Sequence, residues 1–208
     1  MTKLIGTLLI AFSTTLFAQD QVAKDILDKL STTTKSHKNM TVDFDFIFKN
    51  EKQNINEIQK GILVLQEEMF RLEMDEQIII NDGESQWIYL SDMNEVQIME
   101  NDPEEEMMSP NKLFTIYEKG YKYSYVGTES EKNKNLQIID LFPEESGAFI
   151  KITLAVDTSK NQLRKITILD KNGGTYTYLV KNFKSNTNVS PFIFNTDDYD
   201  GVEVIDLR

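Results

Sequence analysis

The chain has 208 residues, of which 40% are hydrophobic and 27% are charged, and it contains no cysteine. This composition is typical of a single globular domain rather than of a disordered chain. Its formal net charge of −12 argues against binding to nucleic acid or to an anionic lipid surface. Because no disulfide can form, the core alone is expected to stabilise the fold.

The first eighteen residues are predicted to be a secretory signal peptide. Lys3 supplies a positive charge, an apolar run extends from Leu4 to Phe12, and small residues lead to Ala18. Such a run is too short to cross a bilayer as a helix. We therefore expect residues 1–18 to be removed on export, and residues 19–208 to form one domain in the periplasm.

An amphipathic helix is expected directly after the signal peptide. Charged residues alternate there with apolar residues that recur at helical spacing, namely Val22, Ala23, Ile26, Leu27 and Leu30. The apolar side of this helix should cover another apolar surface.

From Thr41 onward the apolar period changes to two, which indicates a β-strand with one wet face. Turn sequences such as Asn81-Asp82-Gly83 separate further segments of this kind, as in tight antiparallel hairpins. Strands are predicted at Ile58–Gln66, Met69–Met74, Gln77–Asn81, Gln86–Leu90, Glu95–Glu100, Tyr121–Gly127, Leu136–Leu141, Phe149–Asp157, Gln162–Asp170 and Thr175–Phe183.

About eleven short strands joined by hairpins predict a mainly β protein of the α+β class, built on an open, incomplete antiparallel β-barrel. A second helix is expected between Ser109, a good N-cap that Pro110 follows, and Gly120. The concave face of such a sheet is apolar and has to be covered. The N-terminal helix and the inserted helix are the elements available to cover it.

The sequence carries few candidates for catalysis. His37 is the only histidine, and without a cysteine it cannot complete a zinc site of histidine and cysteine ligands. No serine lies in a Gly-x-Ser-x-Gly turn, and no glycine-rich phosphate loop occurs. A calcium loop around Asp198 is excluded because Leu207 stands where a glutamate ligand is needed. We expect no metal, no cofactor and no catalytic residue.

Several segments carry a family resemblance, in order along the chain. A Gly-led strand at Gly61 is followed by a Phe-Arg strand, an apolar run into Asp-Gly, and a Trp-x-Tyr strand that ends at Tyr89. Later segments are Ser109–Phe114, Leu154–Asp157, Leu163–Ile166, Asp170 with Gly173, Phe192–Phe194 and Gly201–Asp206. Together they resemble the LolA family of periplasmic carriers of outer-membrane lipoproteins.

The resemblance implies an unclosed β-barrel whose mouth is covered by helices, with residues 19–208 as a LolA-like lipid-binding domain. It also implies acylated lipoproteins as cargo, an inner-membrane ABC-type releasing complex as donor and an outer-membrane acceptor. We expect a monomer without enzymatic activity. Many members carry Arg-Pro before the Phe-Arg strand, where the arginine ties the lid to the sheet, whereas this chain has Gln66 and Glu67.

Alternation predicts that Phe70, Leu72 and Met74 share one face of their strand. The acyl-chain cavity is expected to be lined by Leu63, Leu65, Phe70, Leu72, Met74, Trp87, Tyr89, Leu113 and Phe114. Contacts with the lid are expected at Val22, Ile26, Leu30 and Gln66.

Three other functions stay open at this point. One is a LolA-like binding module that senses lipoprotein or stress signals. Another is a hydrolase with an unrecognised pair of carboxylates. The third is a scaffold for partner proteins whose sheet is packed solid, and a dry, filled interface between sheet and helices would favour it.

Overall fold

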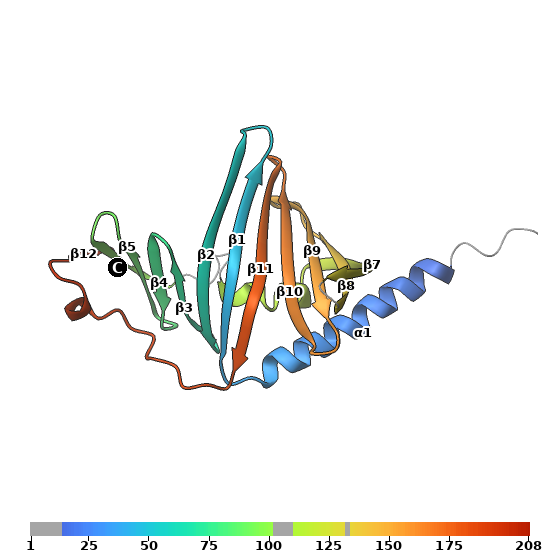
Figure 1. Cartoon of the computed structure of the whole chain (residues 1–208), viewed down its shortest axis with the longest axis horizontal. Helices are drawn as coiled ribbons and strands as arrows, with labels where there is room; N and C mark the ends of the chain where they lie inside the picture. The colour runs from blue at the N-terminus through green and yellow to red at the C-terminus, as the bar shows by residue number, and fades with distance from the viewer. Residues whose placement is uncertain (1–13, 102–109, 132–133) are drawn as a thin grey trace, which may run out of the picture.

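The computed structural model describes residues 14–101, 110–131 and 134–208 (Figure 1). Its strands are β1 (Met40–Asn50), β2 (Ile55–Gln66), β3 (Met69–Met74), β4 (Gln77–Asn81), β5 (Ser85–Leu90), β6 (Glu95–Glu100), β7 (Tyr121–Glu131), β8 (Lys134–Pro143), β9 (Phe149–Asp157), β10 (Gln162–Asp170), β11 (Gly174–Ser185) and β12 (Glu203–Asp206). They form one sheet in the order β12-β6-β5-β4-β3-β2-β1-β11-β10-β9-β8-β7. Neighbouring strands are antiparallel, except that β12 runs parallel to β6.

The predicted fold class is confirmed, because the protein is mostly β and its sheet does not close into a barrel. The alternation pattern also gave the correct bounds for β3, β4, β6, β9 and β10. The described strands number twelve rather than about eleven, because Glu203–Asp206 adds a short parallel strand beside β6.

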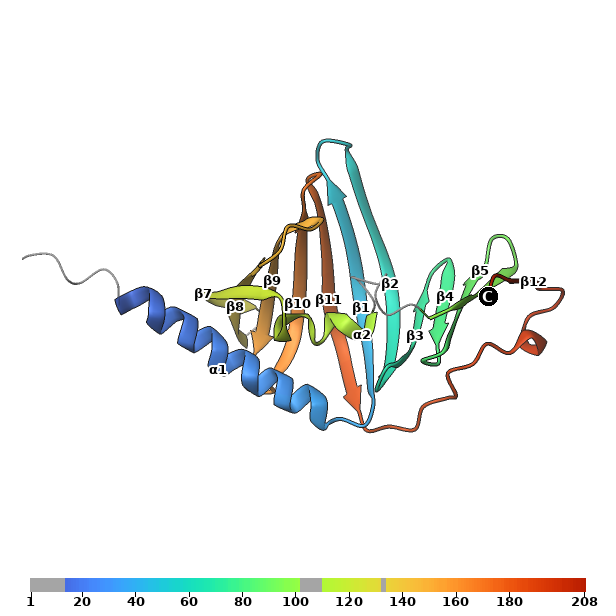
Figure 2. The ribbon, with the colours of Figure 1, turned by 180° about the vertical axis from the view of Figure 1, so that it is seen from behind.

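Irregular pairing bends the sheet into a half-barrel. The register shifts between Asp43 and Phe44 where β1 pairs with β11, and between Tyr125 and Gly127 where β7 pairs with β8. Two further shifts interrupt the pairing of β9 with β10. Because a bulge bends its strand and increases the local twist, these shifts curl β7–β11 around an inner face, which Figure 2 shows from behind.

Two helical elements lie against this sheet. Helix α1 (Thr14–Ser36) contacts β7, β10 and η1. The inserted segment consists of α2 (Pro110–Leu113) and the 3₁₀ helix η1 (Ile116–Glu118), and it lies on the inner face in front of β1 and β11 in Figure 2. The prediction of one continuous helix up to Gly120 was wrong: at Thr115 the backbone adopts φ −128° and ψ 3°, which interrupts the helix. The expected N-cap Ser109 lies outside the described residues.

The main hydrophobic core lies on the inner face, between the sheet and these helices; we call it the inner core. Helix α1 contributes Ala23, Leu27 and Leu30, and the inserted segment contributes Leu113, Phe114 and Tyr117. Its strand residues are Met40, Val42, Phe44, Leu63, Leu65, Phe70, Leu72, Ile139, Leu141, Ile152, Leu154, Val156, Leu163, Ile166, Ile168 and Val180.

The C-terminal segment, residues 186–208, covers the other face of β3–β6. It starts beside β1, where the Asn39 side chain donates to the carbonyl of Thr187 at 2.8 Å and accepts from its N–H at 3.0 Å. It then buries Phe192 and Phe194 against Ile80, Tyr89 and Val96, in a cluster that we call the outer core. The ring of Phe194 stacks on Tyr199 with centroids 4.7 Å apart. Short η2 (Thr196–Asp198) precedes β12.

The outer core predicts that the C-terminal segment is a structural clamp. Phe194→Ala should reduce the free energy of unfolding by about 3–5 kcal/mol, because the side chain is 7% exposed and leaves a cavity. Its neighbour Ile193 is 58% exposed, so Ile193→Ala is the matched control and should change stability by less than about 0.5 kcal/mol. Equal losses for the two variants in urea denaturation would contradict this assignment.

Candidate functional site

The inner face brings together most of the residues that the sequence pointed to. Leu63 and Leu65 of β2, Phe70 and Leu72 of β3, and Leu113 and Phe114 all belong to the inner core, and Met74 packs against it. The pairing of Leu63 with Leu72 and of Leu65 with Phe70 places the strand residues on one face. In the described residues these side chains are buried or half-buried.

Trp87 and Tyr89 are not part of this group. Trp87 pairs with Ile80 and Tyr89 with Ile78, whereas Leu72 pairs with Ile79, so the two aromatic residues point to the opposite face. Tyr89 belongs to the outer core and Trp87 packs against it. The expectation that they share a face with Phe70 is corrected by this register. Both faces of β4 are apolar, so periodicity alone could not assign them.

Of the expected lid contacts, some lie in the inner core and others do not. Leu30 is 1% exposed within the inner core and Ile26 is half-buried against it, but Val22 is 42% exposed and Ala23 is buried in its place. Of the apolar side predicted for α1, Ala23, Leu27 and Leu30 are buried and Ile26 is half-buried, so Val22 alone departs from the expectation. Gln66 pairs with Met69, which packs against the outer core, so Gln66 points away from the helix cover and not toward it.

A carboxylate on η1 ties α1 to the inserted segment, and the sequence gave no sign of it. Glu118 accepts hydrogen bonds from the Ser31 hydroxyl at 2.6 Å and from the Lys35 ammonium at 2.7 Å. We call this group the latch. Burial alone would raise the pKa of Glu118, but the hydrogen bonds and the positive charge of Lys35 outweigh it, and the net pKa is lowered.

A stripe of aromatic side chains continues the inner face beyond the helices. Phe46 and Phe48 of β1 lie beside Tyr176 and Tyr178 of β11, with ring centroids 4.8 Å apart for Phe48 and Tyr176 and 5.2 Å apart for Phe46 and Tyr178. All four are half-buried. Burial raises the pKa of Tyr178 to about 12 and also raises the pKa of Tyr176, so the aromatic stripe is uncharged at neutral pH.

Gly61 leaves room on the inner face for the ring of Phe44. The Phe44 ring lies so close over Gly61 that an added Cβ atom would be 2.3 Å from the Phe44 Cζ atom. Phe44 also packs against Tyr178, with centroids 5.9 Å apart. The Gly-led strand seen in the sequence therefore has a steric reason, because any side chain at position 61 would displace a ring of the inner core.

Few groups at the inner face are suited to chemistry. The hydroxyl of Tyr117 is buried near Thr34 of α1, and burial raises its pKa, so it stays protonated. His37 packs against Phe183 with ring centroids 5.6 Å apart, just before β1. Within residues 14–101, 110–131 and 134–208, no three histidine, cysteine, aspartate or glutamate side chains are grouped to hold a metal ion. The surface presents apolar area and little else.

The described residues thus form an open, curved half-barrel with an apolar inner face under a helical cover. Residues 35–197 match the family described as outer membrane lipoprotein carrier protein LolA, and the chain belongs to this family. Its members are binding and carrier proteins. No curated protein sequence matches the chain. None of the helices in the described part of the chain is both long and apolar enough to cross a membrane.

Solved structures with a TM-score above 0.5 share the fold of this chain at low sequence identity. An uncharacterized conserved protein from Thermus thermophilus superposes with a TM-score of 0.58 at 14% identity, over 89% of this chain and 99% of that chain. The lipoprotein LppX of Mycobacterium tuberculosis gives 0.52 at 12% identity, over 82% and 100%. A LolA superfamily protein from Nitrosomonas europaea gives 0.43 at 12% identity, over 80% and 94%.

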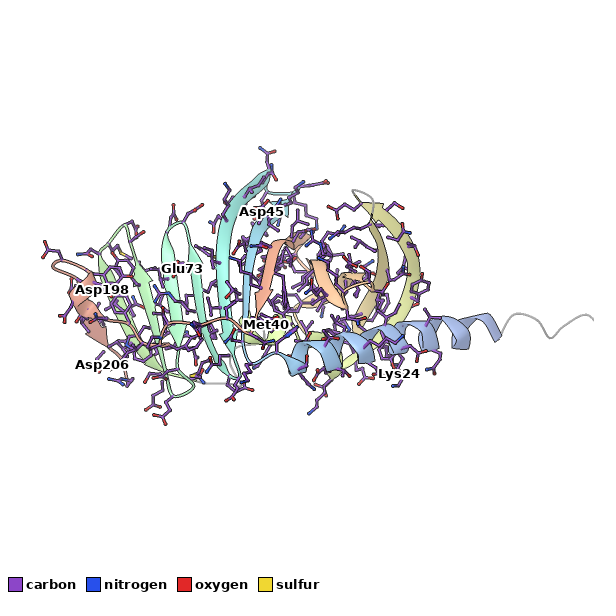
Figure 3. The ribbon with its side chains drawn as sticks, turned by 60° about the horizontal axis from the view of Figure 1, so that its bottom comes forward. Lys24, Met40, Asp45, Glu73, Asp198 and Asp206 are labelled. Atoms are coloured by element: carbon purple, nitrogen blue, oxygen red, sulfur yellow. The ribbon has the colours of Figure 1, made fainter. Side chains whose placement is uncertain are left out.

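The latch predicts a measurable loosening of the cover. Glu118→Gln removes the ion pair, which for a partly exposed pair contributes about 0.2–1 kcal/mol, so amide exchange in α1 and η1 should accelerate by up to about fivefold. Asp28→Asn is the matched control: it breaks the exposed Lys24–Asp28 pair within α1 and should leave η1 unchanged. Figure 3 shows Lys24 on the side of α1 away from the sheet.

The latch should also weaken in acid. The pKa of Glu118 is lower in the folded protein than in the unfolded chain, so its stabilising effect is complete above the unfolded value of about 4.3 and disappears as the pH falls through the folded value. Exchange of η1 amides, corrected for the intrinsic rate, should rise below about pH 4 in the wild type but not in Glu118→Gln. The same acid response in both proteins would rule out Glu118 as its source.

Proposed function

We propose that this protein is a carrier that shields the acyl chains of lipoproteins in an aqueous compartment. The observation that carries the proposal is the inner face itself: a large apolar surface covered by helices that a small polar latch helps to tie together. In this proposal acyl chains replace the helices against Leu63, Leu65, Phe70, Leu72 and Met74. Leu113 and Phe114 move with the cover and contact the chains from the other side.

The energetics explain why a carrier has to have such a surface. Moving an acyl chain of sixteen carbons out of water is favourable by about 12 kcal/mol, at about 0.8 kcal/mol for each methylene group. An acylated protein therefore does not cross an aqueous gap unaided at a useful rate. A cover that competes for the same surface lowers the net affinity, which lets the cargo leave again.

The aromatic stripe supports an entry route. Its four half-buried rings extend the buried inner core toward the far ends of β1 and β11, where no described helix covers them. An acyl chain that first lies along these rings then reaches Phe44 and the inner core. The rings stay neutral at neutral pH, so they do not charge this path.

Membership of the family supports a proposal for the wider route. We propose that residues 1–18 direct export and are removed, which leaves the buried residues Ala23, Leu27 and Leu30 of α1 in place. The mature chain would then act in the periplasm, taking lipoproteins from an inner-membrane ABC-type complex and passing them to an outer-membrane acceptor. Mass spectrometry of material that copurifies with the periplasmic protein tests the cargo, and an absence of acylated proteins or lipids would contradict it.

A scaffold for partner proteins is the second candidate. It is favoured by the burial of the inner core residues under α1 and η1. The two candidates differ in one requirement, since a carrier has to open its cover and a scaffold does not.

A reversible cross-link separates them. In the double variant Ser31→Cys with Glu118→Cys, a short reducible cross-linker should lock α1 onto η1, because the native side chains meet at 2.6 Å. Locking should abolish binding of a fluorescent fatty acid, and reduction should restore it. The control is Lys24→Cys with Asp28→Cys, joined by the same reagent within α1 alone, which should bind normally. Full binding by the locked protein would contradict a moving cover.

The face that binds can be tested on adjacent residues. Phe46 and Ile47 follow each other on β1, are both half-buried and point to opposite faces. Phe46→Glu should weaken fatty-acid binding at least tenfold, the equivalent of burying one large apolar side chain, whereas Ile47→Glu should change it less than twofold. Fatty-acid titrations of the two variants decide whether the inner or the outer face binds. Thermal unfolding checks that the two variants are equally stable.

A further inference from the structure

One straight row of side chains crosses the inner face from β5 to β1. In the register of the sheet, Gln86 of β5 is paired with Asn81 of β4, which is paired with Phe70 of β3. Phe70 is paired in turn with Leu65 of β2, and Leu65 with Met40 of β1. Directly paired residues share one face of a sheet, so all five belong to the inner face, and all five are buried. Figure 1 shows β1 to β5 side by side. We call these five residues the cross-strand row.

The cross-strand row has about the length of an acyl chain. Neighbouring strands lie about 4.8 Å apart, so the row measures about 19 Å from β5 to β1. The hydrocarbon core of a bilayer is about 30 Å thick and holds two acyl chains end to end, so one chain needs about 15 Å. Phe70, Leu65 and Met40 belong to the inner core, so the β1 end of the row is apolar. The other end is polar.

The two amides at the polar end differ in their hydrogen bonds. The Asn81 side chain accepts from the Gly83 N–H at 2.7 Å and donates to the Asn101 side chain at 2.7 Å. Gln86 is 8% exposed, and its Oε1 atom is buried without a hydrogen-bond partner among the described residues. Because a buried acceptor that lacks a donor is unfavourable, nearly all such groups in proteins are paired. The empty protein therefore holds an unpaired acceptor at the end of an apolar row.

The chemistry of acyl chains decides which of them can satisfy Gln86. An acyl chain ends in a carboxylate, an ester or an amide. At neutral pH the carboxylate and the ester offer only acceptors, whereas a secondary amide carries an N–H donor. A carboxylate would in addition bring a charge into a buried site, which is unfavourable unless the charge is paired. The amide is therefore the linkage that fits the acceptor.

We propose that the cross-strand row holds an acyl chain that is joined through an amide, and that Gln86 selects this linkage by accepting its N–H at Oε1. The chain then runs from β5 over Phe70 and Leu65 toward Met40. This inference rests on the proposed function and deepens it, because it names the chemical linkage of the cargo. The hydrogen bond forms only in the loaded protein, so Gln86 contributes selectivity and does not stabilise the empty protein. Such an exchange of stability for function is common in binding sites.

Displacement of a fluorescent fatty acid from the full folded chain tests the linkage. The competitors are methyl laurate, N-methyl lauramide and N,N-dimethyl lauramide, which share one acyl chain. N-methyl lauramide should displace the probe at a lower concentration than N,N-dimethyl lauramide, although it has one methyl group fewer to bury, because it alone carries an N–H. The opposite order would overturn the proposal, and this comparison needs no variant.

Matched variants then place the selectivity at Gln86. Gln86→Met removes the acceptor at nearly constant side-chain length, so the preference for N-methyl lauramide over methyl laurate should fall about fivefold, as expected for one hydrogen bond. Gln97→Met is the control: Gln97 pairs with Ile88 on the same face, and its amide donates to Glu95 at 2.8 Å. That variant should leave the preference unchanged. Comparing ratios between variants cancels the different hydration of esters and amides.

The outcomes separate this inference from the proposed function. If the wild type binds the fluorescent fatty acid but its preference is the same in Gln86→Met, the linkage is wrong and the carrier remains. If the wild type binds neither the fatty acid nor any competitor, both are wrong. Gln86→Met should also unfold at the same urea concentration as the wild type, because it loses no hydrogen bond of the empty protein. A clear loss of stability would mean that Gln86 has a structural partner, and it would overturn the proposal.

Discussion

Burial of the apolar inner face is the interaction on which the rest of this structure depends. A sheet of twelve strands that bends without closing leaves one concave apolar surface, whose exposure to water is unfavourable. The helices are the described elements that lie over it. The helices pack against the sheet through the buried residues Ala23, Leu27 and Leu30 of α1 and through the inserted segment, and the latch joins the two. The same apolar area thus stabilises the empty protein and, in the proposed function, is the surface that the cargo takes.

The two parts of the sheet bury their apolar faces against different elements. Around β7–β11 the strands curl, and their inner side packs against α1 and η1. Around β3–β6 the outer side is also apolar, and the C-terminal segment covers it with Phe192 and Phe194. In the proposed function the C-terminal segment would keep the outer face of β3–β6 packed while the inner face is exposed to cargo.

Much of the fold was readable from the sequence, because strands with one wet face show a clear period of two. Five strands have the predicted bounds, and the residues on β2 and β3 share the face that alternation gave them. The pattern failed where both faces are apolar: Ile78, Ile79 and Ile80 give no sign of which face is inner, so Trp87 and Tyr89 were placed on the wrong one. The latch was missed because Glu118 lies 87 residues from Ser31, and only tertiary structure brings them together.

The pairing of β1 with β11 sets the order in which the molecule can form. Met40 pairs with Ser185 and Asn50 with Gly174, so one side of β1 has no partner until nearly the whole chain has been synthesised. Contacts of such long range make folding slow. The sheet is therefore joined across β1 only after β11 has been made, whereas the hairpins from β2 to β6 can pair as soon as they have been synthesised.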